Sequence, residues 1–188
     1  MTEVRIGRLA AIEPGQMTEA QRRLYDSILK GRRGGTGVVD SKGCLRGPFN
    51  ALLHSPKVGE AVQALGTAIR HGSSLSRRAQ ELAILMVASQ ERSEFEWDSH
   101  VRLAESVGLS SEQVLAIREG RNPGITDPIE RAVLQTTALL LSNRDLQDSE
   151  YDEAVRHLGY AGLVDLSSLI GYYQLLALQI RIFRVGIE

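Results

Sequence analysis

A glutamate and a histidine in the middle of the chain have the spacing of an acid–base pair. Glu96 and His100, within the segment EFEWDSHVRLAE, are four residues apart, so on a helix their side chains lie on the same face. A carboxylate beside an imidazole raises the proton affinity of the imidazole and fixes its tautomer, as general acid–base catalysis requires. Spacing alone also fits a structural ion pair, because this pattern occurs by chance on many helices.

Other polar and aromatic residues could complete a site around this pair. Trp97, three residues before His100, could wall a cleft and exclude water, and Ser93 continues the face of Glu96. Arg46 could pair with a substrate carboxylate, although a solvated loop arginine is an equal interpretation. Tyr172 or Tyr173 could donate a hydrogen bond to a carbonyl or enolate, although packing in the core is the simpler role for either one. The candidate substrate-binding residues are therefore Trp97, Ser93, Arg46, Phe49 and Tyr172.

The elements that must position these residues are predicted to be helices. Helix-start signals occur at Thr18, Ser76, Ser110 and Asp127, and each is followed by apolar residues at helical spacing. Gly108 and Gly159 are predicted to end helices, and a Leu-rich final helix is expected over about residues 161–183. Strand signals are confined to residues 37–39. The fold class is therefore predicted to be all-α, with about seven to nine helices in a single-domain bundle over residues 1–188.

A glycine-rich segment interrupts this helical pattern over about residues 31–47. It has six glycines between Gly31 and Asn50, which is too many for a helix, and it is too long for an ordinary connector. Such loops are either disordered or functional. Gly47, Pro48 and Phe49 at its apolar end indicate that its second half is packed.

Composition restricts the cellular context and the partners. Lys and Arg total 22 and Asp and Glu total 23, so the formal net charge of −1 offers no general field for nucleic acid or an anionic membrane. The arginine pairs, such as Arg32–Arg33, are too short to form a basic stripe. Cys44 is the single cysteine, so an intramolecular disulfide is impossible. Without a signal peptide or an uninterrupted apolar run of about 20 residues, the chain is expected to be soluble and cytoplasmic.

Several segments together resemble the carboxymuconolactone decarboxylase / alkylhydroperoxidase D-like superfamily. Glu81 followed by LAILMVASQ, then EFEWDSH, then Gly108–Leu109–Ser110, is similar to the central motif of that family. LRGPF with HSP resembles the segment ahead of the motif, and LIGYY resembles its closing helix. The resemblance covers most of the chain, from about Leu45 to Phe183. It identifies a family but does not identify a reaction.

The peroxidase branch of this family carries a CxxC pair between the glutamate and the histidine. Counting back from His100 places the two cysteine positions at Ser93 and Glu96, while the upstream glutamate corresponds to Glu81. Dithiol chemistry needs a thiolate nucleophile and a resolving thiol, and serine and glutamate supply neither. We therefore do not expect peroxide reduction by a dithiol route.

The decarboxylase branch implies proton transfer in a small pocket, with loss of CO2 from a lactone carboxylate and without a cofactor or metal. By this resemblance His100 is the acid or base, and either Glu96 or Glu81 orients it. Of these two, Glu96 is expected to share the proton transfer and Glu81 to have a supporting role. A metal held by Glu81, Glu96 and His100 is a minority interpretation, since there is no second histidine. Two alternatives stay open: another proton-transfer reaction (isomerase, cyclase or hydrolase), and a non-catalytic binding or assembly module. The resemblance also implies a homo-oligomer (dimer, trimer or hexamer).

Overall fold

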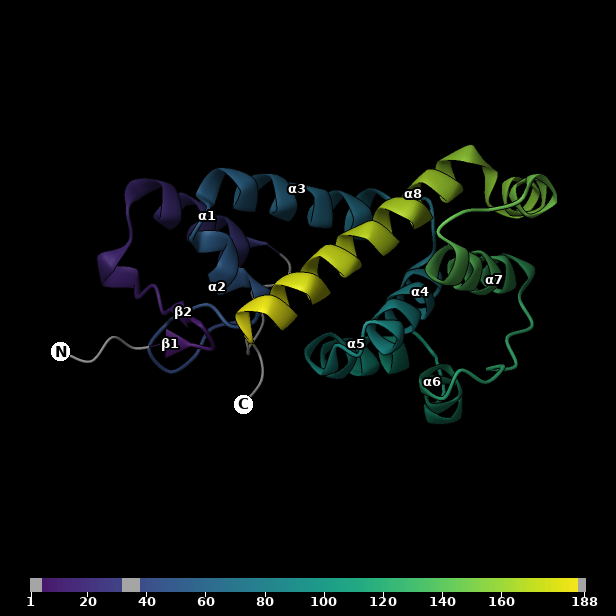
Figure 1. Ribbon diagram of the computed structural model, residues 1–188, viewed down its shortest axis with the longest axis horizontal. Coiled ribbons are helices and arrows are strands. Elements are labelled where there is room, and N and C mark those ends of the chain that lie inside the picture. Colours follow the sequence, from purple (N-terminus) through teal and green to yellow (C-terminus); the bar gives the residue numbers. More distant parts are fainter. Residues whose placement is uncertain (1–4, 32–37, 186–188) are drawn as a thin grey trace. The chain divides into compact units, whose positions relative to one another are not determined.

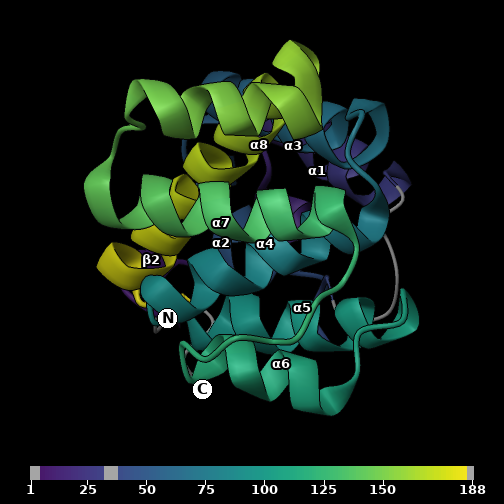
Figure 2. The same ribbon diagram turned by 90° about the vertical axis from the view of Figure 1, so that its right-hand side faces the viewer.

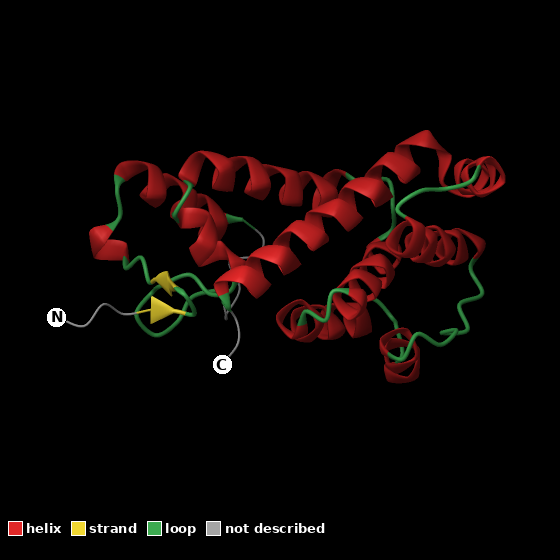
Figure 3. Cartoon of the chain, in the orientation of Figure 1, coloured by secondary structure: helices red, strands yellow, loops and turns green. Residues whose placement is uncertain are grey.

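The computed structural model describes residues 5–31 and 38–185, and helices account for most of them (Figure 3). Eight α-helices lie within these residues, so the all-α prediction is confirmed. Residues 32–37 of the glycine-rich segment, including the Arg32–Arg33 pair, lie outside the described residues. The chain divides into two compact units, one comprising Met1–Thr67 and Leu178–Glu188 and the other Ala68–Ala177. The single-domain prediction stays a prediction.

The first unit begins with a two-stranded hairpin that the sequence did not predict. β1 (Arg5–Ile6) and β2 (Leu9–Ala10) pair antiparallel across Gly7, whose φ of 62° suits a glycine. The strands are too short to show period-two alternation of apolar and polar residues, so the hydrophobic pattern did not predict them. After a 3-10 turn (Pro14–Gln16) come α1 (Glu19–Lys30), α2 (Pro48–Leu53) and the start of α3 (Pro56–Gly72).

The buried amide of Asn50 and the exposed imidazole of His54 link the hairpin segment to the α2 region through hydrogen bonds. The Asn50 side chain accepts a hydrogen bond from the amide of Ile12 and donates one to the carbonyl of Ala10, both at 3.3 Å. His54 Nε2 lies 3.0 Å from the same Ala10 oxygen. Asn50 is fully buried, so these bonds satisfy polar groups that would otherwise be costly inside the protein.

The second unit is built around α4 (Arg77–Gln90), which packs against three other helices. α7 (Pro128–Asn143) lies on one side of α4, and α5 (Glu94–Ser106) and α6 (Ser111–Arg118) lie on the other (Figures 1 and 2). This central position explains why nine of the ten residues of α4 from Ala79 to Ala88, all except Met86, are buried.

The predicted helix starts are confirmed by their capping bonds. Thr18 and Ser110 each form a capping box, with Gln21 and Gln113 respectively. Ser76 accepts a hydrogen bond from the amide of Ala79, and Asp127 accepts one from the amide of Glu130. Local side-chain chemistry therefore fixes where these four helices begin.

The last helix, α8 (Asp148–Phe183), contains the predicted break at Gly159, which has a non-helical conformation with φ 66° and ψ 172°. Among the described helices, α8 is long and apolar enough to cross a membrane by length and composition alone. Polar residues interrupt the apolar stretch of α8, so it was not predicted to span a membrane on the criterion of an uninterrupted apolar run. The apolar stretch is 44% buried inside the protein, and core helices of soluble proteins pass the same test.

Candidate functional site

Glu81 and His100 meet inside the second unit. His100 Nδ1 lies 2.6 Å from Glu81 Oε2, and the two side chains are only 9% and 3% exposed. The residues come from α4 and α5, which pack directly against each other. Since the carboxylate accepts a hydrogen bond from Nδ1–H, Nε2 is the ring nitrogen that would exchange a proton with a bound molecule.

Arg70 and Tyr173 extend this pair into a buried network of four side chains. Arg70 Nη2 lies 3.7 Å from Glu81 Oε1, and Arg70 Nη1 donates a hydrogen bond of 2.8 Å to the Tyr173 hydroxyl. The Tyr173 ring meets the imidazole of His100 edge to face, with 5.1 Å between centroids. Residues from α3, α4, α5 and α8 therefore converge on one point within the second unit.

Arg70 keeps its charge in this buried setting. Burial opposes the charged form, but the phenolic oxygen of Tyr173 and the carboxylate of Glu81 outweigh it, so the pKa of the Arg70 guanidinium is raised. The network therefore holds an ion pair where an isolated buried charge would be costly.

Glu96 and Ser93 lie at the start of α5, within one to two turns of His100. Glu96 is 4% exposed and Ser93 is 6% exposed. Ser93 occupies the N-cap position, yet its hydroxyl makes no capping bond, and its buried Oγ has no hydrogen-bond partner in the described chain. The sequence paired His100 with either glutamate; the structure places Glu81 on Nδ1. The proton-transfer role of Glu96 stays a prediction.

Trp97 faces a hydrophobic cluster of the second unit. It packs there with Leu82, Leu85 and other buried residues of α4, α5 and α6. The guanidinium of Arg118 lies over the indole ring at 4.7 Å from its centroid. These contacts give Trp97 a packing role, and its predicted role as a wall of the substrate pocket is untested.

The other predicted substrate-binding residues are divided between the two units. Tyr172 is buried in the second unit, and its ring meets that of Tyr173 edge to face at 5.3 Å. Arg46, which is exposed, and Phe49, which is half-buried, belong to the first unit. The structure thus brings Tyr172 beside the network, whereas the roles of Arg46 and Phe49 stay predictions.

Arg70 was not predicted from the sequence, and Tyr173 was predicted only as an alternative to Tyr172. A signal for Arg70 was present, because it follows Gln63 and Gly66 on the buried face of α3 at helical spacing. An arginine in line with buried positions needs a partner inside the protein. The partners could not be read from spacing, since Glu81 and Tyr173 lie on other helices.

The described residues contain no group of three or more His, Cys, Asp or Glu side chains arranged to hold a metal ion. Cys44 lies fully buried in the first unit. Burial, followed by the charges of Asp40 and Glu13, raises the pKa of its thiol, which disfavours the reactive thiolate. Two cavities in the second unit are lined by residues other than those predicted for the site.

Residues 56–139 match the model of the carboxymuconolactone decarboxylase family. The matched residues include Glu81, Ser93, Glu96 and His100, and the match confirms the family resemblance that the sequence predicted. A comparison with curated proteins found no match.

Several solved structures have folds similar to that of this chain. An uncharacterized peroxidase-related protein from Ralstonia eutropha JMP134, with an alkylhydroperoxidase AhpD core, has a TM-score of 0.73 at 13% identity, covering 98% of this chain and 93% of that one. A debrominase in complex with 2,3,4-tribromopyrrole has a TM-score of 0.69 at 14% identity, covering 95% and 90%. A protein of unknown function from Agrobacterium tumefaciens has a TM-score of 0.63 at 22% identity, covering 72% and 93%. At these identities the likeness concerns the fold alone.

Proposed function

We propose that this protein is an enzyme that moves a proton, without a cofactor, on a small carboxylated lactone, keto acid or aromatic-derived compound. The observation that carries the proposal is the buried hydrogen bond between His100 and Glu81, backed by Arg70 and Tyr173. A histidine held at Nδ1 by a carboxylate has its other nitrogen oriented for general acid–base catalysis. The match of residues 56–139 to the carboxymuconolactone decarboxylase family model also supports enzymatic activity.

In the favoured reaction, a decarboxylation, the electron pair of the breaking C–C bond passes into a dienolate and CO2 leaves. His100 then protonates the carbanionic carbon through Nε2, while Glu81 stabilises the imidazolium form of the acid. Glu96 is proposed to share this proton transfer. Low exposure around His100 favours the reaction, because a dry site disfavours the charge of the departing carboxylate.

The test uses a panel of carboxylated γ-lactones and β-keto acids, with CO2 release and solvent-deuterium incorporation measured together. His100→Ala and Glu81→Gln are each expected to lower kcat by about 10²–10⁴-fold, the usual contribution of a general acid or base. His157→Ala is the matched control, because His157 also pairs with a glutamate, Glu153, but at a half-buried position of α8. It should leave kcat unchanged.

The outcomes separate the alternatives. Folded His100→Ala and Glu96→Gln proteins that keep the wild-type rate would refute the assignment. Deuterium incorporation without CO2 would select an isomerase, cyclase or hydrolase. The absence of turnover across the panel, with the wild-type protein and all four variants folded and equally inert, would support a binding or assembly module. We further infer that the protein acts in the cytoplasm as a soluble homo-oligomer, with no nucleic-acid or membrane partner.

A further inference from the structure

A cavity of about 460 Å³ lies in the second unit, between α4, α6, α7 and the connection over residues 119–127. This volume is within the range of about 300–1,000 Å³ that small-molecule sites occupy. None of the residues proposed for proton transfer lines it. The apolar lining residues are Met86, Ile117, Pro123, Ile125, Leu134 and Ala138.

The apolar floor of this cavity is continuous with the hydrophobic cluster of the second unit. Ile117 and Ile125 are buried members of that cluster, and Met86 and Leu134 pack against it while remaining partly exposed. Apolar surface left in contact with water is unfavourable by about 25 cal/mol per Å². A ligand with an apolar body would therefore gain free energy by covering Met86 and Leu134.

Two arginines lie at this cavity, and they differ in their pairing. The guanidinium of Arg121 is engaged by Glu119, with Nη2 and Oε2 2.5 Å apart. The guanidinium of Arg131 makes no hydrogen bond or ion pair with any residue among 5–31 and 38–185. The cavity thus combines an apolar floor with one cationic group whose charge is not neutralised by a bonded carboxylate.

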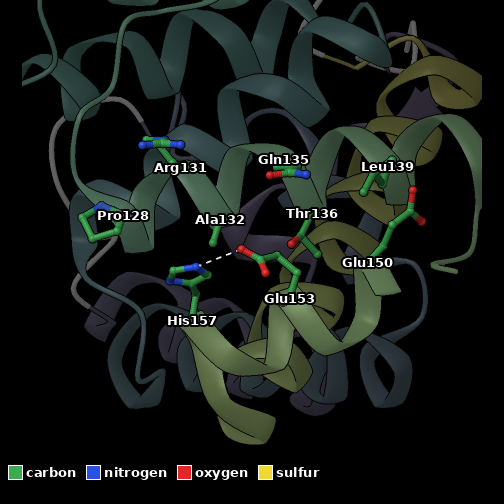
Figure 4. Close-up of a pocket in the computed structure, with 10 residues that line it drawn as sticks. Pro128, Arg131, Ala132, Gln135, Thr136, Leu139, Glu150, Glu153 and His157 are labelled. Atoms are coloured by element: carbon green, nitrogen blue, oxygen red, sulfur yellow. Dashed lines mark hydrogen bonds and ion pairs between the residues drawn. The ribbon is translucent and has the colours of Figure 1, made fainter. Parts of the chain in front are cut away.

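Arg131 also lines the smaller neighbouring cavity between α7 and the start of α8, where carboxylates are present. Figure 4 draws Arg131 together with Glu150 and Glu153, and its single dashed line joins His157 to Glu153. Neither carboxylate is therefore an ion-pair partner of the guanidinium. Gln135 follows Arg131 by one helical turn and lines the same two cavities, so its amide can bond the same anion.

We propose that the larger cavity binds a small molecule with an apolar, aromatic or branched body and one carboxylate. The body covers Met86, Leu134 and Ala138, and the carboxylate accepts hydrogen bonds from Arg131 and Gln135. This site uses none of the residues assigned to proton transfer. It is therefore a binding site separate from the proposed catalytic network, and it stands whether or not that proposal holds.

Two fluorescent probes that differ by one charge test the site in the full-length protein. 8-Anilinonaphthalene-1-sulfonate has an apolar body with an anionic group, and N-phenyl-1-naphthylamine is the same body without it. Both are expected to bind saturably, with one site per chain, and 2-naphthoate should displace the anionic probe competitively. Ala138→Phe, which fills the cavity, should weaken both probes.

Matched arginine variants identify the anion-binding group. Arg131→Gln is expected to weaken the anionic probe about tenfold or more, because a hydrogen bond to a charged group is worth about 1.5–3 kcal/mol, and to leave the neutral probe unchanged. Arg121→Gln and His100→Ala should change neither probe by more than about twofold. The proposal would be overturned by non-saturable binding or by binding that is insensitive to Ala138→Phe. It would also be overturned if the two arginine variants weakened the anionic probe equally.

Discussion

At the scale of single residues, one carboxylate contacts two nitrogen-bearing side chains. Glu81 offers Oε2 to the imidazole of His100 and Oε1 to the guanidinium of Arg70. Both arrangements are buried, so neither partner can be removed without leaving a charge poorly compensated. The same residue that orients the histidine therefore also stabilises the fold at this point, and a folded-state control must accompany every substitution of Glu81.

Asp165 provides a residue-scale prediction of pH dependence. Its Oδ2 accepts hydrogen bonds from Ser73 Oγ at 3.1 Å and from both the amide and the hydroxyl of Ser74 at 2.8 Å. Burial would raise the pKa of this carboxyl group, but the bonds from Ser74 and Ser73 outweigh burial and lower the pKa. Because the folded-state pKa lies below the unfolded value, the bonds stabilise the ionised form.

We expect Asp165→Asn to lower the free energy of unfolding at pH 7 by about 1–2 kcal/mol. The stabilisation is complete above the unfolded pKa of about 4 and is lost as the pH falls further, through the lowered folded-state pKa. Urea unfolding of both proteins at pH 7 and pH 3 measures this difference. A destabilisation that is the same at both pH values would show that ionisation of Asp165 is not the cause.

At the scale of elements, the first unit depends on a close approach at Gly59. A Cβ at this position in α3 would lie 2.5 Å from Leu24 Cδ2 of α1 and 2.7 Å from the carbonyl oxygen of Leu52 in α2. The leucine side chain can move, but the backbone carbonyl of α2 cannot yield without shifting the helix. Glycine therefore sets how closely these helices pack.

Gly59→Ala should destabilise the protein by about 1–3 kcal/mol, the usual cost of overpacking. Gly72→Ala in the same helix is the control, because a Cβ there meets nothing within 4 Å. Thermal unfolding of the two variants provides the comparison. Equal melting temperatures for both would refute the packing argument.

Most element boundaries were predictable because they rest on local chemistry. The capping residues Thr18, Ser76, Ser110 and Asp127 act within one turn, and Gly159 breaks α8 through its own φ angle. The Glu81–His100 pair was predicted through the family resemblance. Arg70 and Tyr173 could not be placed, since their contacts join helices far apart in sequence. Trp97 illustrates the same limit, because spacing cannot distinguish a pocket wall from a core residue.

At the scale of the whole molecule, the exposed face of α8 supports the proposed homo-oligomer. Val164 is 62% exposed and Leu175 is 37% exposed, and eleven residues of helix, or about three turns, place them on one face. Ser167 and Gly171 lie between them and are also exposed, and small residues allow a neighbouring helix to approach closely. A second copy of the chain would bury this face.

We expect sedimentation equilibrium at micromolar concentration to show a dimer, trimer or hexamer, and Val164→Glu to shift the protein toward the monomer by placing a charge in the interface. Val58→Glu is the matched control, because Val58 is similarly exposed, at 55%, but lies on α3. A monomeric wild-type protein, or equal dissociation by both variants, would contradict the assignment of this face.

The distribution of two unique residues gives the molecule a built-in pair of unfolding reporters. Cys44, the one cysteine, is fully buried in the first unit, and Trp97, the one tryptophan, is buried in the second. Thiol labelling therefore follows the opening of the first unit, while indole fluorescence follows the loss of packing around Trp97. Transitions that coincide in urea would mean that the 188 residues unfold as one cooperative domain, and transitions that separate would divide the stability between the two units.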